Sequence, residues 1–184
     1  MMRLFVGLGL PPEVAHRLES LGGGVPGARW VAARNLHITL CFIGEVEDGL
    51  ARELHDDLAD LRLPAFALGL NGFGTFGHNK PNHLWAGVEK VPGLLRLQAK
   101  VETSVARLGV PPEGRKYTPH VTLARFKGAP VGRVQDFIAR NSPFHAGPWT
   151  VEQFILFRSH LGHGGAEYEA IAEYPLNLSP MDLS

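Results

Sequence analysis

Apolar and polar positions alternate along the chain with two periods, one typical of strands and one typical of helices. Short apolar runs bounded by glycine, proline or polar residues predict seven strands, over residues 4–10, 36–43, 66–70, 83–88, 120–126, 151–157 and 167–176. Leucine and valine at spacings of three and four residues predict four helices, over residues 11–21, 48–61, 92–108 and 131–139. Pro12 and Pro92 suit the first turns of two of these helices, where a backbone N–H is not needed.

The order of these elements indicates the fold class. Several predicted strands follow one another with no helix between them, so strand and helix do not alternate strictly. This order favours an α+β fold with mostly antiparallel sheets. No long linker, charge run or low-complexity segment marks a boundary, and we expect a single domain over residues 1–184.

Composition narrows the class of function. The 184 residues are 45% apolar and 20% charged, which is typical of a globular protein. Lys and Arg number 18 and are balanced by 18 Asp and Glu, so the net charge is zero. This balance argues against a protein that coats duplex DNA through bulk charge. A small nucleic-acid site with a few local cations stays open.

Cysteine content and hydropathy bear on the compartment. The single cysteine, Cys41, excludes an intramolecular disulfide and a zinc site built from several cysteines. The N-terminal apolar run is interrupted by Pro11 and Pro12 and is too short to span a membrane. We therefore expect a cytoplasmic protein that does not associate with membranes.

One tetrapeptide occurs twice in matching surroundings. His-Ile-Thr-Leu at residues 37–40, the first motif, recurs 83 residues later as His-Val-Thr-Leu at residues 120–123, the second motif. With 9 His, 6 Thr and 25 Leu in the chain, chance predicts only about 0.04 copies of His-x-Thr-Leu. Both copies fall in predicted strands. The repeat therefore indicates an internal duplication with a shared role.

Strand geometry places the polar residues of each motif on one face. Side chains alternate between the two faces of a strand, so His37 and Thr39 share a face, as do His120 and Thr122. The apolar residues between them face a core. Two such strands brought together would place two imidazoles and two hydroxyls around one groove.

This set of groups suits phosphodiester cleavage. A neutral histidine takes a proton from the nucleophile, and a protonated histidine gives one to the leaving oxygen. The two threonine hydroxyls can donate hydrogen bonds to the non-bridging phosphate oxygens. The chemistry then requires no metal ion. His160 and His163 lie in a glycine-rich segment with no carboxylate at ligand spacing, and we expect no metal site.

Other side chains near the motifs have competing interpretations. Cys41 shares the face of His37 and Thr39, which allows a cysteine nucleophile, although a small buried thiol is the commoner role. Four aromatic residues could stack on a nucleic-acid base, but core packing is the expected role for each; they are Trp30, Phe42, Phe76 and Phe126.

Arg125 is the best cationic candidate for holding a phosphate. Strict alternation places its side chain opposite those of His120 and Thr122. It reaches a phosphate bound at the second motif only if the end of the strand twists or bulges.

At these residues the sequence resembles the 2H phosphoesterase superfamily, named for two His-x-Ser/Thr-x motifs. It is most similar to the bacterial and archaeal RNA 2′,3′-cyclic phosphodiesterases, historically called 2′-5′ RNA ligases. The resemblance covers almost the whole chain and rests on residues 3–5, 10–11, 35–40, 42–45, 119–125, 156–159 and 168–169. It implies a two-lobed, pseudo-symmetric fold, with a mostly antiparallel sheet in each lobe, helices on the outer faces and the active cleft between the lobes.

The resemblance also implies an activity. It predicts hydrolysis of a terminal 2′,3′-cyclic phosphate on RNA, tRNA fragments among them, to a 2′-phosphate by a monomeric enzyme without a cofactor. His37 would be the proton donor and His120 the proton acceptor, with Thr39, Thr122 and Arg125 binding the substrate. ATP-independent 2′-5′ ligation would follow if an RNA 5′-hydroxyl replaced water.

Two other functions stay open from the sequence. One is a phosphodiesterase for small cyclic nucleotides or 2′-5′ oligonucleotides, which uses the same chemistry. The other is a non-catalytic module that binds RNA ends. A His37→Ala variant separates catalysis from binding, because binding can survive the loss of the imidazole while turnover cannot.

Overall fold

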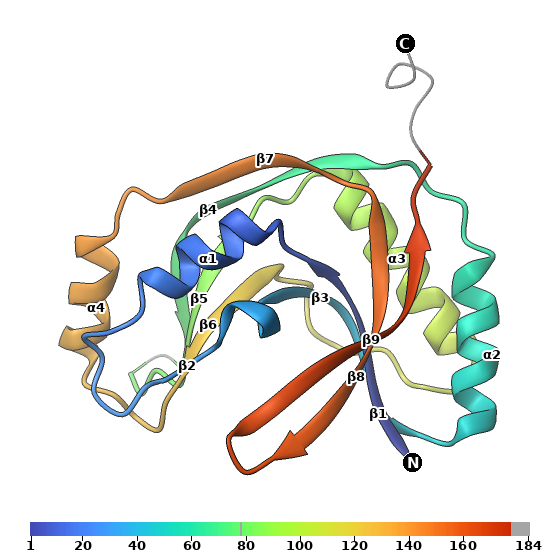
Figure 1. Ribbon diagram of the computed structural model, residues 1–184, viewed down its shortest axis with the longest axis horizontal. Coiled ribbons are helices and arrows are strands. Elements are labelled where there is room, and N and C mark those ends of the chain that lie inside the picture. The colour runs from blue at the N-terminus through green and yellow to red at the C-terminus, as the bar shows by residue number, and fades with distance from the viewer. Residues whose placement is uncertain (78, 178–184) are drawn as a thin grey trace.

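The computed structural model describes residues 1–77 and 79–177, which form two antiparallel sheets with helices packed against them (Figure 1). The α+β fold with two antiparallel sheets, predicted from the order of elements and the resemblance, is therefore confirmed.

The first sheet has four strands in the order β3-β1-β8-β9. Its strands are β1 (Met2–Gly9), β3 (His37–Val46), β8 (Gln153–Gly162) and β9 (Gly165–Pro175). The five consecutive residues 4–8 of β1 are all buried. A continuous apolar run is what a central strand covered on both faces requires.

The second sheet has five strands in the order β2-β6-β5-β4-β7. Its strands are β2 (Arg29–Trp30), β4 (Phe66–Phe76), β5 (His83–Val88), β6 (His120–Arg125) and β7 (His145–Val151). Buried and half-buried residues alternate strictly along β5. One face of this sheet therefore belongs to the core, and the other is partly exposed.

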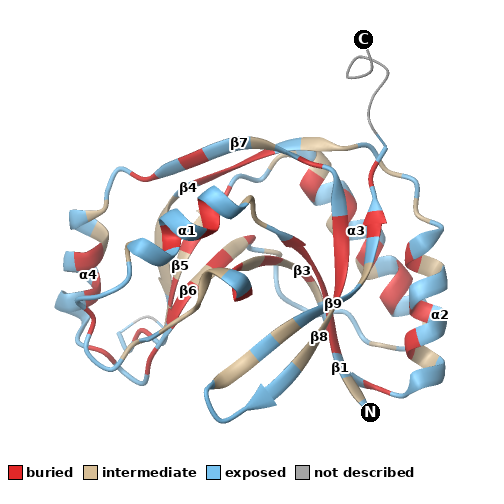
Figure 2. Cartoon of the chain, in the orientation of Figure 1, coloured by how far each residue is buried: buried red, intermediate tan, exposed pale blue. Residues whose placement is uncertain are grey.

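Helices cover the sheets with their apolar stripes (Figure 2). They are α1 (Pro12–Ser20), α2 (Asp48–Ala59), α3 (Pro92–Arg107), α4 (Val131–Arg140) and the short 3₁₀ helix η1 (Ala33–Asn35). Helix α3 contacts β3, and α2 contacts α3 and β9. On the other sheet, Phe137 of α4 is fully buried against Trp30 and Phe73. All four predicted helices are present, with ends within a few residues of those expected.

Three strand predictions were wrong in extent. Strand β4 continues to Phe76 because a bulge at Gly72, which has a φ of 73°, lets pairing with β5 resume. Strand β7 was not predicted, and the segment 151–157 is divided between β7 and β8. The glycine-rich segment over residues 159–166, which lies between two predicted strands, is itself mostly strand, because β8 and β9 form a long hairpin that projects from the molecule (Figure 1). Its solvent-exposed end has no apolar alternation to identify it.

The two motif strands meet where the lobes join. Strand β3, which carries the first motif, contacts β6, which carries the second. The Tyr117 hydroxyl, just before β6, donates a 2.8 Å hydrogen bond to the Thr39 carbonyl in β3. The fold therefore brings together two segments that lie 83 residues apart, as the duplication predicts.

Close approach of β1 to β3 requires a glycine at position 7. A Cβ atom at Gly7 would lie 2.6 Å from the Ile38 carbonyl oxygen, inside the first motif. We expect Gly7→Ala to lower the free energy of unfolding by about 1–3 kcal/mol, because β3 must move away. The measurement is urea-induced unfolding. Gly9→Ala on the same strand is the matched control, since its Cβ would meet only the Ile155 side chain at 3.7 Å. Equal urea midpoints for the two variants would contradict the argument.

Candidate active site

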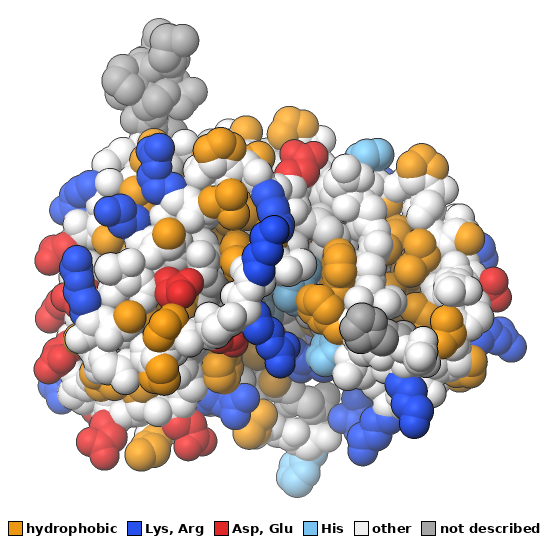
Figure 3. Space-filling view, turned by 180° about the vertical axis from the view of Figure 1, so that it is seen from behind, with side chains coloured by type: hydrophobic (Ala, Val, Ile, Leu, Met, Phe, Trp, Pro, Cys, Tyr) orange, Lys and Arg blue, Asp and Glu red, His pale blue; other side chains and the backbone are white. Residues whose placement is uncertain are grey.

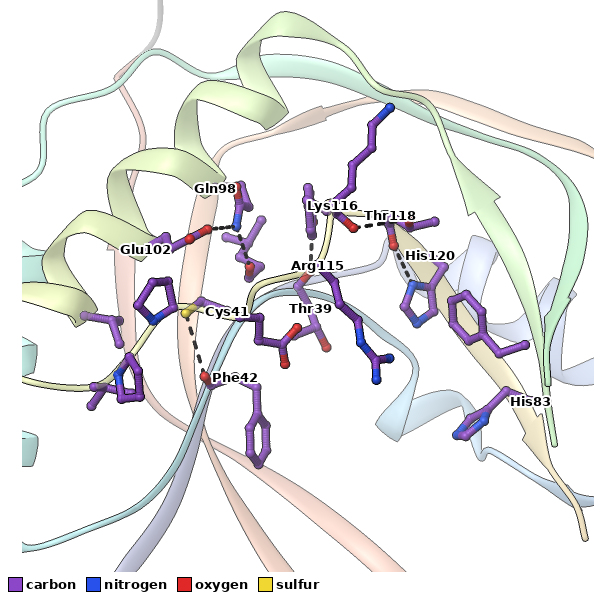
Figure 4. Close-up of a pocket in the computed structure, with 18 of the residues that line it drawn as sticks. Thr39, Cys41, Phe42, His83, Gln98, Glu102, Arg115, Lys116, Thr118 and His120 are labelled. Carbon is purple, nitrogen blue, oxygen red and sulfur yellow. Dashed lines mark hydrogen bonds between the residues drawn. The ribbon is translucent and has the colours of Figure 1, made fainter.

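The two motifs border a cavity of about 670 Å³ between the lobes (Figure 4). Thr39 of the first motif and His120 of the second both line it. His37, Thr39, His120 and Thr122 are all half-buried. Thr39 and His120 thus line one cavity, whereas His37 lines a neighbouring pocket with Asn35 and Tyr168. The charge of His120 acts on His37, so the two imidazoles lie near each other.

The imidazole of His37 is held in a fixed orientation. Its Nδ1 lies 2.8 Å from the Asn35 carbonyl oxygen, and its Nε2 lies 3.1 Å from Thr39 Oγ1. A carbonyl can only accept, so Nδ1 carries a proton and donates it. In the neutral ring Nε2 is then an acceptor for the Thr39 hydroxyl. The rings of Phe5 and Tyr168 pack at 4.8 and 4.9 Å from that of His37.

His120 repeats this arrangement in the other lobe. Its Nδ1 donates a 2.7 Å hydrogen bond to the Thr118 carbonyl oxygen, again the carbonyl two residues earlier. Phe76 packs edge-on against the ring at 5.0 Å, and Trp85 lies 6.0 Å away. In both motifs a backbone carbonyl therefore fixes the neutral tautomer, with the proton on Nδ1 and the basic lone pair on Nε2.

Burial makes both imidazoles less basic than usual. It lowers the pKa of His37 to about 4, and the charges of Arg125 and His120 act in the same direction against the Asn35 carbonyl. Burial also lowers the pKa of His120, against the opposing effect of the Thr118 carbonyl. Both rings are consequently neutral in the free protein near neutral pH. A bound anion would favour protonation of either one.

A bulge in β6 corrects the expected position of Arg125. Trp85 pairs with Thr122, whereas Leu84 pairs with Ala124, so Leu123 is an extra residue on β6. The bulge shifts the alternation by one residue, and Leu123 and Ala124 are both buried while Arg125 is exposed. The guanidinium of Arg125 depresses the pKa values of His37 and His83, so its charge acts on the site. From the sequence, Arg125 was expected to reach a phosphate at the second motif only if the end of the strand twists or bulges, and β6 does bulge there.

Asn35 joins the first motif to the β8–β9 hairpin, and the sequence offered no signal for this. Its buried side chain donates to the Ala166 carbonyl at 3.2 Å and accepts from the Tyr168 N–H at 3.3 Å. Beside it, Arg34 and Glu167 form a bidentate ion pair at 2.7 and 3.1 Å. The carbonyl that orients His37 is thereby anchored to a strand more than 130 residues away.

Other sequence candidates separate into two groups. Phe42 and Phe76 are 42% and 37% exposed and line the cavity, whereas Trp30 and Phe126 pack in the core. Cys41 also lines the cavity, but burial raises the pKa of its thiol to about 11, and the thiol stays protonated. A cysteine nucleophile therefore has no support from its surroundings.

The cationic surroundings of the site are visible on the molecular surface. Lys and Arg side chains border a hollow in the middle of one face, and histidine side chains show within it (Figure 3). Arg115 and Lys116, from the loop before β6, are among the cavity-lining residues. A chain with zero net charge thus carries a local cationic rim.

The described part of the chain offers neither a metal-binding cluster nor a membrane-spanning helix. Within residues 1–77 and 79–177, no group of three or more His, Cys, Asp or Glu side chains is placed to hold a metal ion. His160 instead pairs with Glu169 at 3.1 Å across the hairpin. None of the helices within these ranges combines the length and the apolar character that crossing a bilayer requires.

The chain matches a known protein family over most of its length. A family model described as the 2′-5′ RNA ligase superfamily matches residues 10–163, which include both motifs. The chain belongs to this superfamily. The prediction drawn from the twin motif is therefore confirmed.

Two relatives in the superfamily are named RNA 2′,3′-cyclic phosphodiesterase. The Aeropyrum pernix protein is 43% identical over 108 residues, which are 58% of this chain and 61% of the relative. The Geobacillus stearothermophilus protein is 30% identical over 183 residues, covering 96% of this chain. That alignment covers 58% of the relative, so the chain spans about three fifths of the length of these two proteins.

A solved structure gives the same relationship in three dimensions. Escherichia coli LigT complexed with 3′-AMP is 28% identical and superposes with a TM-score of 0.78. The superposition covers 95% of this chain and 98% of LigT. The two-lobed arrangement is thus shared along nearly the whole of both chains.

Proposed function

We propose that this protein hydrolyses the 2′,3′-cyclic phosphate at the end of an RNA to a 2′-phosphate. The reaction uses His37 and His120 as acid and base and needs no metal ion. The observation that carries the proposal is the matched pair of imidazoles, each with Nδ1 fixed by the carbonyl two residues earlier. The names of the relatives supply the substrate, and the complex of LigT with 3′-AMP supports a nucleoside phosphate in the cleft.

The proposed reaction is an in-line displacement at phosphorus. His120 Nε2 takes a proton from a water molecule, whose oxygen forms a bond to phosphorus. The bond to the ribose 3′ oxygen breaks, and His37 Nε2–H protonates that oxygen. The products are a 2′-phosphate and a 3′-hydroxyl. This division of roles follows the resemblance to the superfamily, because the two motifs are too symmetric to assign it.

Charge in the transition state is held by three further side chains. The hydroxyls of Thr39 and Thr122 donate to the non-bridging oxygens, and Arg125 supplies a positive charge. The substrate also activates the acid. His37 has a pKa of about 4 in the free protein, and a phosphodiester anion beside the ring raises that pKa toward neutrality.

The test is end-group analysis of a defined RNA. An oligonucleotide ending in a 2′,3′-cyclic phosphate is incubated with the protein in EDTA. The products are identified by mass and by resistance to a 3′-specific phosphatase, which separates a 2′-phosphate from a 3′-phosphate. We expect conversion to a 2′-phosphate by the wild type and none by the double variant His37→Ala/His120→Ala. Loss of activity in EDTA that zinc restores would overturn the metal-independent mechanism. Binding without turnover would favour the RNA-end binding module.

Several finer predictions remain part of the same proposal. tRNA fragments as substrates, a monomeric state and a cytoplasmic location are expected from the resemblance. Ligation in the reverse direction uses the same groups, with an RNA 5′-hydroxyl in place of water. A second RNA with a free 5′-hydroxyl tests ligation, and the mass of the protein in solution tests the monomeric state.

Arg125 is expected to contribute mainly to substrate binding. Arg125→Gln removes a charge that faces the phosphate in both the ground state and the transition state. We expect KM to rise roughly tenfold with a smaller change in kcat. Steady-state kinetics with the cyclic-ended RNA measure both constants. Arg133→Gln is the matched control, because Arg133 is an exposed arginine on α4, outside the two motif strands. Equal KM values for the two variants would contradict the role of Arg125.

A further inference from the structure

The cavity extends well beyond the two motifs. From His120 and Thr39 it continues past Cys41 to Gln98 and Glu102 of α3 (Figure 4). Its volume of about 670 Å³ exceeds what a cyclic phosphate alone would occupy. The part below α3 has no role in the acid–base chemistry, so it is available for another portion of the substrate.

The chemical character of the lining changes along this cavity. Arg115 extends toward the end where His120 lies (Figure 4). The apolar part of the lining includes the ring of Phe42, which is 42% exposed, and the side chains of Val110 and Pro111. The far end carries Gln98 and Glu102. The lining therefore combines a cation near His120, apolar walls and a polar cluster on α3, which are the three kinds of group that contact the phosphate, the base faces and the base edge of a nucleotide.

The far end offers hydrogen-bond acceptors. Gln98 Nε2 donates to Glu102 Oε2 at 2.7 Å and to the Leu40 carbonyl at 3.4 Å. These contacts use the amide donors of Gln98 and leave its carbonyl oxygen as an acceptor. The carboxylate of Glu102 can only accept. Glu102 and Glu113 both raise the pKa of Cys41, which places their negative charges near the same wall of the cavity.

We propose that the α3 end of the cavity binds the base of the terminal nucleoside and that Glu102 selects bases carrying an amino group. This inference rests on the proposed function, because the cyclic phosphate must occupy the two histidines for the base to reach α3. Guanine fits best, since its adjacent N1–H and N2–H groups can donate together to one carboxylate. Adenine and cytosine offer an amino donor.

Uracil is the base that this site disfavours. It presents one N–H between two carbonyl oxygens, and those oxygens face the acceptors of Gln98 and Glu102. Water molecules donate hydrogen bonds to the Glu102 carboxylate in the free protein. A uracil carbonyl oxygen next to the carboxylate displaces them without supplying a donor, and this weakens binding. The apolar walls and Phe42 contact any base equally, because every base has a stacking face. Discrimination therefore depends on Glu102 rather than on stacking.

The experiment compares four RNAs that differ only in the terminal nucleoside 2′,3′-cyclic phosphate. For the wild type we expect kcat/KM to be roughly tenfold higher with guanosine than with uridine. Glu102→Gln keeps the shape of the side chain and adds donors, so the guanosine-to-uridine ratio should fall to about one. Glu53→Gln makes the same charge change on the exposed face of α2 and should leave the ratio as in the wild type.

Each outcome bears on the proposal. Equal kcat/KM for the four RNAs with the wild type would overturn it, as would an unchanged ratio in Glu102→Gln. The wild-type comparison needs no variant, so a failure of Glu102→Gln to fold leaves the test intact.

A binding measurement separates this inference from the proposed function. If none of the four ends is opened, the proposed hydrolysis is wrong. Calorimetry with guanosine and uridine 2′-monophosphates then tests the cavity directly. Tighter binding of the guanosine compound that is lost in Glu102→Gln supports the base site, and equal affinities overturn it.

Discussion

Replacing His120 by alanine is expected to lower kcat about 10²- to 10⁴-fold on an RNA with a 2′,3′-cyclic phosphate end. The variant loses the base that accepts the proton of the attacking water. Replacing His37 by alanine should have an effect of similar size, because the 3′ oxygen would leave without its proton. Rapid-quench kinetics at saturating RNA measure the chemical step for each variant.

The combination of the two substitutions tests whether the histidines act as a unit. Removing one member of a catalytic pair removes most of the benefit of the other, so the double variant should be little slower than either single variant. His83→Gln is the matched control. His83 is a second imidazole in the cavity that His120 lines, its pKa is also lowered by burial, and its Nδ1 is bonded to the Asn82 side chain. A loss in His83→Gln as large as in His120→Ala would contradict the two-histidine mechanism.

The fold and the centre of the site could be predicted because their causes are local. Alternation along a strand is enough to place His37 with Thr39 and His120 with Thr122. The duplicated motif then implies that two such strands lie together, and the contact between β3 and β6 agrees with this. The helices were predictable for the same reason, since the apolar stripe of a helix is visible within a single segment of the sequence and needs only a core to pack against.

The parts that could not be predicted depend on contacts between distant segments. The bulge at Leu123 arises from the pairing of β6 with β5, and nothing within residues 120–125 distinguishes it from regular strand. The anchoring of Asn35 depends on β9, and the acceptors on Gln98 and Glu102 become significant only because α3 packs over β3. A sequence pattern reports the face of an element, but not which element covers that face.

The pH dependence of kcat/KM should reveal the unusual acidity of the two imidazoles. Catalysis by the free protein needs one ring protonated and the other neutral. Burial lowers the pKa of His37 to about 4 and holds that of His120 below the usual 6.5. Above the higher of the two pKa values both rings are neutral. We therefore expect kcat/KM to reach its maximum below about pH 6.5 and to fall roughly tenfold per pH unit at higher pH.

The profile of kcat should lie at higher pH than that of kcat/KM. A bound phosphodiester carries a negative charge that raises the pKa of each imidazole, and kcat reports the complex rather than the free protein. Measurements from about pH 4 to about pH 9 give both profiles. Arg125→Gln provides a further check, because removing a positive charge that lowers the pKa of His37 should move the acidic limb of kcat/KM to higher pH. A kcat/KM that stays constant from pH 6 to about pH 8 would show that the burial of His37 and His120 does not control the reaction. In that case the proton transfers must be assigned to groups other than these two rings.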